Sequence, residues 1–88
     1  MIDHIKTTIK SIITDAEIYV FGEDGEHFEA LVISKEFIGK PLIKQHQLVM
    51  NALKSEFDSN QVHALALKTF TPEKWNTAKS QFNLDLAK

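Results

Sequence analysis

Histidines are the residues of this 88-residue chain with the most distinctive chemistry. There are four of them, His4, His27, His46 and His63, and there is no cysteine. A neutral imidazole binds transition metals, and histidine replaces cysteine on one iron of Rieske-type iron–sulfur centres. Because the chain has no thiol, disulfides and zinc ribbons are excluded, and any cluster bound here needs thiolates from another molecule.

No catalytic set accompanies these histidines. The serines have no patterned base and orienting acid near them in the sequence. The carboxylates between positions 23 and 26 crowd one acidic loop, where nothing would raise a pKa for acid catalysis. A chain of this length also buries only about 60–65% of its unfolded surface, which leaves little core for a deep cleft. We therefore expect a binding module and not an enzyme.

The charge of the chain bears on nucleic-acid binding. The formal net charge is −2, and all ten basic residues are lysines, with no arginine. Nucleic-acid-binding domains usually carry a basic excess, and arginine is the side chain that reads guanine and grips phosphate best. Sequence-specific DNA recognition is thus disfavoured overall, but a local surface of Lys35, Lys40 and Lys44 beside Gly39 keeps a nucleic-acid partner as the alternative.

Three segments have the apolar spacing of amphipathic helices. The first covers residues 3–14, with Asp3 as its N-cap. The second covers 40–57, with Pro41 in the first helical position and His46 on its apolar stripe, where a packed, hydrogen-bonded core histidine is expected. The third begins at Thr71 as a hydroxyl N-cap, followed by proline and glutamate, and fades before position 86.

Three further segments have the composition of strands. Residues 17–21 and 27–34 flank a turn at 22–25 and form a hairpin. Residues 61–70 are apolar on both faces, which indicates a strand covered on both sides or a central one. The order of helices and strands predicts one α+β domain over residues 1–88, a two-layer sandwich with three strands.

Five segments of the chain resemble the BolA family in order and spacing, over Ile5 to Trp75. The short length is similar to the compact bacterial branch associated with acid stress. The resemblance implies an αββααβ fold like that of a type II KH domain, with a three-stranded mixed sheet and a C-terminal helix. The matching segments are His27–Ser34, Phe37–Leu42, His46–Val49, Val62–Thr69 and Thr71–Trp75.

The resemblance also implies a role. Members of the family partner monothiol glutaredoxins and share a [2Fe–2S] cluster with them, without holding a cluster alone. The cluster-ligand histidine of the family maps onto His63, and the second ligand, from the hairpin loop, maps onto His27. The alternatives are a half-buried, hydrogen-bonded His63 and an exposed turn histidine at position 27. If both bind one cluster, they must lie on adjacent strands, close together and facing the same way.

Some family members act as DNA-binding regulators of transcription and stress response. Their helix-turn-helix-like segment maps onto Phe37–Val49, where many members have arginine–histidine–arginine and this chain has Lys44-Gln45-His46-Gln47. The pattern GxxG of KH domains occurs at 22–25, but it is acidic and lies in the hairpin, so we interpret it as a turn. The chain contains no apolar run of about 18 residues and no secretory signal, which favours the cytoplasm and no membrane partner. A homodimer remains open.

Overall fold

The computed structural model describes residues 2–22, 27–57 and 65–87. Three sequence predictions fall outside this part of the chain: most of the hairpin turn, the end of the second helix at 58–60, and the first residues of the third strand. The described elements, in chain order, are α1 (Ile2–Ile12), β1 (Glu17–Phe21), β2 (Phe28–Ile33), the 3₁₀ turn η1 (Lys35–Phe37), α2 (Leu42–Lys54), β3 (Leu65–Phe70), α4 (Pro72–Ala78) and the 3₁₀ turns η2 (Lys79–Gln81) and η3 (Leu84–Leu86).

The three strands form one mixed sheet, as predicted, and their order is β1-β2-β3. β1 runs antiparallel to β2, with Tyr19 opposite Leu31, and β3 runs parallel to β2, with Phe28 opposite Leu65. The central strand is β2, whose last four residues are all buried. The prediction of a central third strand is wrong: β3 lies at the edge, and its Ala66 and Lys68 are exposed.

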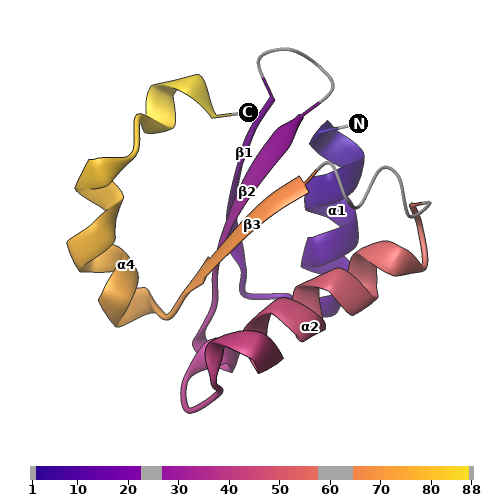
Figure 1. Ribbon diagram of the computed structural model, residues 1–88, viewed down its shortest axis with the longest axis horizontal. Helices are drawn as coiled ribbons and strands as arrows, with labels where there is room; N and C mark the ends of the chain where they lie inside the picture. The colour runs from indigo at the N-terminus through magenta and orange to yellow at the C-terminus, as the bar shows by residue number, and fades with distance from the viewer. Residues whose placement is uncertain (1, 23–26, 58–64, 88) are drawn as a thin grey trace.

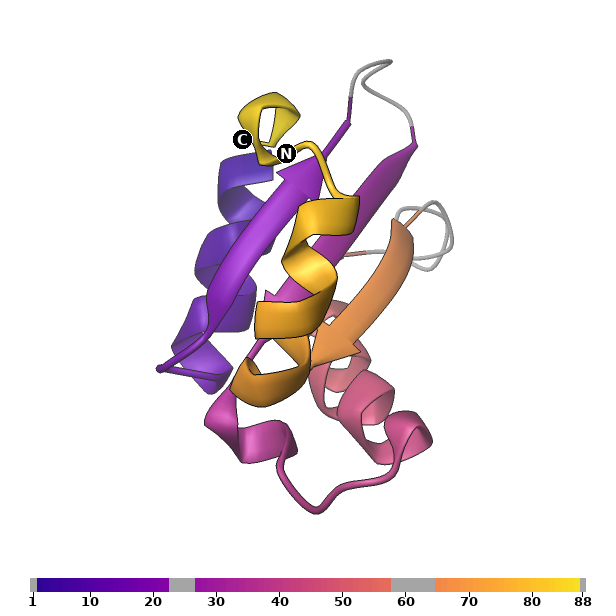
Figure 2. The ribbon, with the colours of Figure 1, turned by 90° about the vertical axis from the view of Figure 1, so that its left-hand side faces the viewer.

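Helices cover both faces of the sheet (Figures 1 and 2). α1 and α2 lie side by side on one face, and α4 crosses the other face. The alternation of β2 accounts for this arrangement, because side chains of successive strand residues point to opposite faces. Ala30 and Val32 face α1 and α2, whereas Leu31 and Ile33 face α4, as the sequence predicts. The two-layer sandwich therefore has a C-terminal helix added to its second face.

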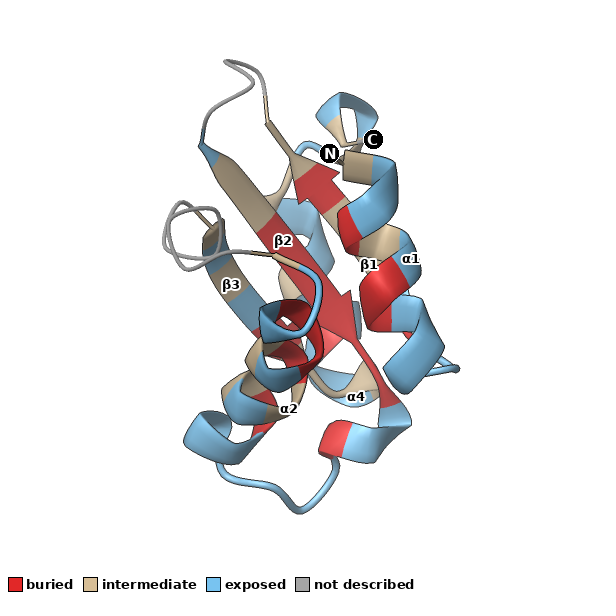
Figure 3. Ribbon diagram, turned by 90° about the vertical axis from the view of Figure 1, so that its right-hand side faces the viewer, coloured by how far each residue is buried: buried red, intermediate tan, exposed pale blue. Residues whose placement is uncertain are grey.

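The main core lies between the sheet and the pair α1 and α2, where the buried parts of these elements meet (Figure 3). Every buried side-chain polar atom in the described part of the chain has a hydrogen-bond partner. The side chains of this core are almost all aliphatic; the residues are Ile5, Ile9, Ile13, Ala16, Val20, Ala30, Val32, Phe37, Val49 and Leu53.

The face covered by α4 has a smaller and more aromatic core. Trp75 is 5% exposed and packs on Leu31 and Ile33. Its ring stacks on Tyr19 at 5.6 Å and lies 5.2 Å from the ring of Phe70, measured between centroids. α4 is held in position by Thr71, the predicted N-cap, whose hydroxyl accepts a hydrogen bond from the N–H of Lys74 at 3.4 Å.

The register of α2 differs from the sequence prediction. The i, i+4 spacing of Leu42 and His46 predicts both on the core stripe of this helix, but Leu42 is 60% exposed and His46 is only half-buried. Gln45 is buried in their place, because its side chain satisfies backbone carbonyls of the preceding loop. Pro41 precedes α2 with an extended backbone instead of occupying its first position, and the helix ends at Lys54, short of the predicted position 57. Asp3 likewise lies in the first turn of α1 instead of capping it.

A carboxylate ties the turn after α1 to the end of β2. Asp15 accepts hydrogen bonds from the hydroxyl of Ser34 at 2.5 Å and from the N–H of Lys35 at 2.9 Å. These two hydrogen bonds hold the pKa of Asp15 below its usual value, because they favour the charged carboxylate. Ser34 in turn caps η1, because its hydroxyl accepts a hydrogen bond from the N–H of Glu36.

In the described part of the chain, no helix has the length and apolar character needed to cross a membrane.

Candidate functional site

In the sequence, the two predicted cluster ligands come shortly before two neighbouring strands of the sheet. His27 is exposed and directly precedes Phe28, the first residue of β2. His63 lies outside the described residues, two positions before Leu65, the first residue of β3. Phe28 and Leu65 are directly opposite each other in a parallel pair, so β2 and β3 begin at the same end of the sheet. The strands that follow the two histidines are therefore adjacent. The positions of the two imidazoles, their separation and the way they face stay predictions.

Local packing fixes the beginning of β2, and with it the backbone beside His27. The ring of Phe28 lies against the main core and directly over Gly22, at the end of the opposite strand. A Cβ at position 22 would overlap this ring, at 2.6 Å from its Cε1 atom, so only glycine allows the close approach. β3 is also tied to β2 here, because the ammonium group of Lys68 lies 3.3 Å from the carboxylate of Glu29.

The predicted nucleic-acid residues lie together in the segment between β2 and α2, at the lower end of the molecule in Figure 1. Lys35, Lys40 and Lys44 are all exposed, and Gly39 has a φ of 79°, which explains a glycine at this position. Sequence reasoning missed that these lysines surround exposed apolar side chains. We call these three lysines and the exposed apolar residues among them the tip. Its apolar residues are Ile38, Leu42 and Ile43, exposed by 63%, 60% and 65%.

The tip is held firmly by the residues behind it. Phe37 is fully buried in the main core, which anchors one end of the loop. The side-chain amide of Gln45 donates to the carbonyl of Lys40 at 2.9 Å and to that of Phe37 at 3.4 Å. The carbonyl oxygen of this amide accepts a hydrogen bond from the hydroxyl of Thr69 on β3 at 2.7 Å. The exposed apolar side chains are therefore presented on an ordered backbone.

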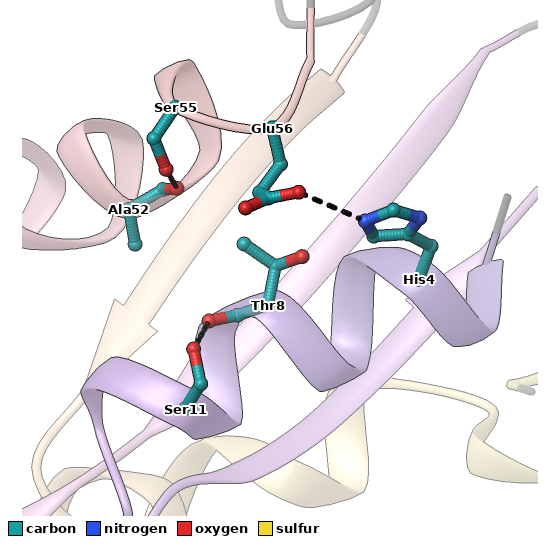
Figure 4. Close-up of polar contacts among 6 residues, drawn as sticks. All are labelled: His4, Thr8, Ser11, Ala52, Ser55 and Glu56. Atoms are coloured by element: carbon teal, nitrogen blue, oxygen red, sulfur yellow. Dashed lines mark hydrogen bonds and ion pairs between the residues drawn. The ribbon is translucent and has the colours of Figure 1, made fainter.

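The remaining histidines show no sign of a metal centre. The imidazole of His4 lies 3.5 Å from the carboxylate of Glu56, across an open groove of about 300 Å³ between α1 and α2 (Figure 4). The same ring packs edge-on against Phe57, with 4.9 Å between the centroids. Across residues 2–22, 27–57 and 65–87, no three histidine or acidic side chains are grouped so that they could hold a metal ion. The described part of the chain therefore has no complete metal-binding site of its own.

Comparisons with known proteins bear on the identity of the chain. The family model described as BolA-like protein matches residues 4–74. The acid stress protein IbaG of Escherichia coli is 29% identical over 73 residues, which cover 83% of this chain and 86% of IbaG. The DNA-binding transcriptional regulator BolA of Vibrio cholerae is 30% identical over 74 residues, which cover 83% of this chain and 69% of the regulator.

A solved structure has the same fold. The structure of a bolA protein homologue from Coxiella burnetii superposes with a TM-score of 0.72 at 38% identity, and it covers 86% of this chain and 96% of its own. The resemblance seen in the five sequence segments is thus confirmed by sequence and by structure. This chain belongs to the BolA-like family.

Proposed function

We propose that this chain is an adaptor that partners a monothiol glutaredoxin in the cytoplasm and helps to hold a shared [2Fe–2S] cluster. The observation that carries the proposal is the parallel pairing of β2 and β3 from their first residues, Phe28 and Leu65. It brings Phe28 and Leu65, which follow His27 and His63 by one and two positions in the sequence, to the same end of the sheet. Membership of the BolA-like family supports the same role.

The donor chemistry fits this role. The chain contributes imidazoles and has no thiol, whereas [2Fe–2S] clusters are held by thiolates or by thiolates with histidine. A glutaredoxin supplies the thiolates in this arrangement, and His27 and His63 supply nitrogen ligands to the cluster. His27 is exposed, so a partner can approach it without unfolding of the sheet. The likeness to an acid stress protein supports a role in the stress response. In this proposal the chain acts as a binding partner and has no enzymatic activity of its own.

Anaerobic co-expression with a monothiol glutaredoxin tests this role. We expect visible absorption and circular dichroism of a cluster, distinct from those of glutaredoxin alone, in the purified complex. His63→Ala and His27→Ala should each change or abolish that spectrum. His4→Ala is the matched control, because His4 is a partly exposed imidazole elsewhere on the surface, and its variant should leave the spectrum unchanged. A spectrum identical to that of glutaredoxin alone, with separate elution of the two proteins, would overturn the proposal.

Nucleic-acid binding is the second candidate, and the lysines of the tip are the observation in its favour. Three exposed apolar side chains stand among these lysines, which suits a protein surface better than a phosphate backbone. A salt titration separates the two, because binding through phosphates weakens steeply as salt rises. If DNA binds, the variant with Lys35, Lys40 and Lys44 all changed to alanine should lose affinity and salt dependence together.

Size-exclusion chromatography of the free chain decides whether it forms a homodimer.

A further inference from the structure

The outer edge of β1 is a second feature that could bind a partner. In the sheet order β1-β2-β3, β1 pairs with β2 alone among the described elements. A strand with one partner directs part of its backbone N–H and C=O groups away from the sheet, and these groups can pair with another chain. In Figure 2, β1 lies at one side of the sheet and α1 lies behind it. The edge is therefore backed by a helix but not covered by a strand.

A groove accompanies this edge. It has a volume of about 440 Å³ and lies between α1 and β1. Ile18 and Ala16 form an apolar floor, whereas α1 contributes Lys6 and Lys10 as well as two hydroxyl groups. The ammonium group of Lys10 donates to the carbonyl of Ala16 at 2.7 Å, which places a positive charge at the end of the groove where β1 begins. Among the residues that the structure describes, none of those lining the groove is acidic.

We propose that this edge binds an extended acidic segment of a partner protein, which adds a fourth strand beside β1. β1 is five residues long, so a partner segment of similar length would span it. Backbone hydrogen bonds to β1 would supply affinity, and an apolar side chain of the segment would enter the groove over Ile18. Carboxylates of the segment would lie next to Lys6 and Lys10, which selects an acidic sequence over a basic one.

Lysines beside an edge strand can also act as protection against pairing. Protective lysines usually belong to the strand itself, however, whereas Lys6 and Lys10 belong to α1 and border a groove with an apolar floor. This arrangement provides a place for a side chain of the added strand as well as for its charge. The inference uses neither the histidines nor the tip, so it does not depend on the proposed function.

Titration of the ¹⁵N-labelled full chain with a synthetic peptide tests the proposal. The probe is a capped seven-residue peptide of sequence Thr-Glu-Thr-Val-Thr-Glu-Thr, whose valine and two glutamates share one face of an extended strand. We expect chemical-shift changes along Glu17–Phe21 and at the face of α1 that lines the groove. The variant with Lys6→Glu and Lys10→Glu should bind about tenfold more weakly, because two attractive pairs become repulsive. The control variant with Lys74→Glu and Lys79→Glu carries the same change in charge at exposed positions of α4 and η2, and should bind like the unchanged chain.

A second probe separates strand addition from simple charge attraction. The same peptide with methyl groups on alternate backbone nitrogens keeps its charges but loses hydrogen-bond donors, and it should bind about tenfold more weakly. Equal binding of both peptides would overturn strand addition, as would shift changes away from β1 or no binding at all. Lys10 contacts the backbone, so circular dichroism must first show that the double variant is folded. If it is not, Lys6→Glu alone replaces it, with Lys74→Glu as its control.

Discussion

The two faces of the sheet are packed by different chemistry. The face under α1 and α2 buries aliphatic side chains such as Ile9 and Leu53, which interlock over a wide area. The face under α4 is held by a few rings around Trp75, with Leu31 and Ile33 buried beneath them. Buried apolar area is the main source of stability, so the first face carries most of it and the second depends on one large residue.

Polar groups divide between the faces in the same way. The aliphatic face contains a buried polar pair, Gln45 and Thr69, which fixes the backbone of the tip. On the aromatic face the polar groups stay at the rim: the hydroxyl of Tyr19 donates to the carboxylate of Glu17, and the ammonium group of Lys68 lies 5.2 Å from the centre of the Phe82 ring. Buried polar pairs are costly to break, whereas exposed ones contribute little.

The largest effect should come from a cavity in the aliphatic core. Ile9 is fully buried, and Ile9→Ala should lower the free energy of unfolding by about 3–4 kcal/mol, because the removed methyl groups leave space that the neighbours cannot fill. Urea denaturation followed by circular dichroism measures the loss. Ile12→Ala is the matched control on the same helix, where the side chain is 53% exposed, and it should cost less than about 0.5 kcal/mol. Equal losses would contradict the burial of Ile9 in the aliphatic core.

Replacement of Trp75 should lower the stability of the fold less than Ile9→Ala does, and its effect should be confined to α4. Trp75→Ala should lower the free energy of unfolding by about 3 kcal/mol, the lower end of the range for large aromatic residues, because α4 can collapse or detach. Hydrogen exchange should show loss of protection in α4, with little change in α2. Trp75→Phe keeps a ring in the site and should retain much of the stability. Equal loss of protection in α2 would mean that the two faces unfold as one unit.

Much of this fold was predictable, because period-2 alternation in β2 and the helix-start signals at Thr71 are local. The register of α2 was not predictable in the same way. An i, i+4 stripe put Leu42 and His46 in the core, but Gln45 is buried because it satisfies carbonyls of a loop that precedes it in the chain. No local signal marks such a glutamine. The edge position of β3 is likewise set by strand order, which composition does not encode.

The candidate site was predictable only in part. Resemblance located His27 and His63 in the sequence, and the parallel pairing of β2 and β3 placed their neighbours Phe28 and Leu65 together. The lysines of the tip were found from charge alone. The apolar residues among them were assigned to the core or passed over, because an exposed and a buried leucine look the same in sequence.

A smaller effect should come from the polar pair of the aliphatic face. Thr69→Val keeps the shape of the side chain but leaves the carbonyl oxygen of Gln45 buried without its donor, so stability should fall by about 1–2 kcal/mol. Amide resonances of the tip should shift too, because Gln45 holds its backbone. Thr7→Val, on the exposed side of α1, is the control and should change neither. A stable variant with an unchanged tip would show that the pair does not position the loop.

The smallest effect on stability, and the sharpest test of the aromatic rim, concerns Tyr19, the only tyrosine. The hydrogen bond to Glu17 and then partial burial raise its pKa from 10.0 to about 12. The neutral phenol therefore contributes its stability below pH 10, and this contribution is lost as the pH rises from 10 toward 12. Glu17→Gln should return the midpoint of the phenolate absorbance toward 10 and change stability little at neutral pH, because the pair is exposed. Circular dichroism over the same range checks that the fold survives. An unchanged midpoint in the variant would mean that burial against Trp75, and not the rim hydrogen bond, controls the tyrosine.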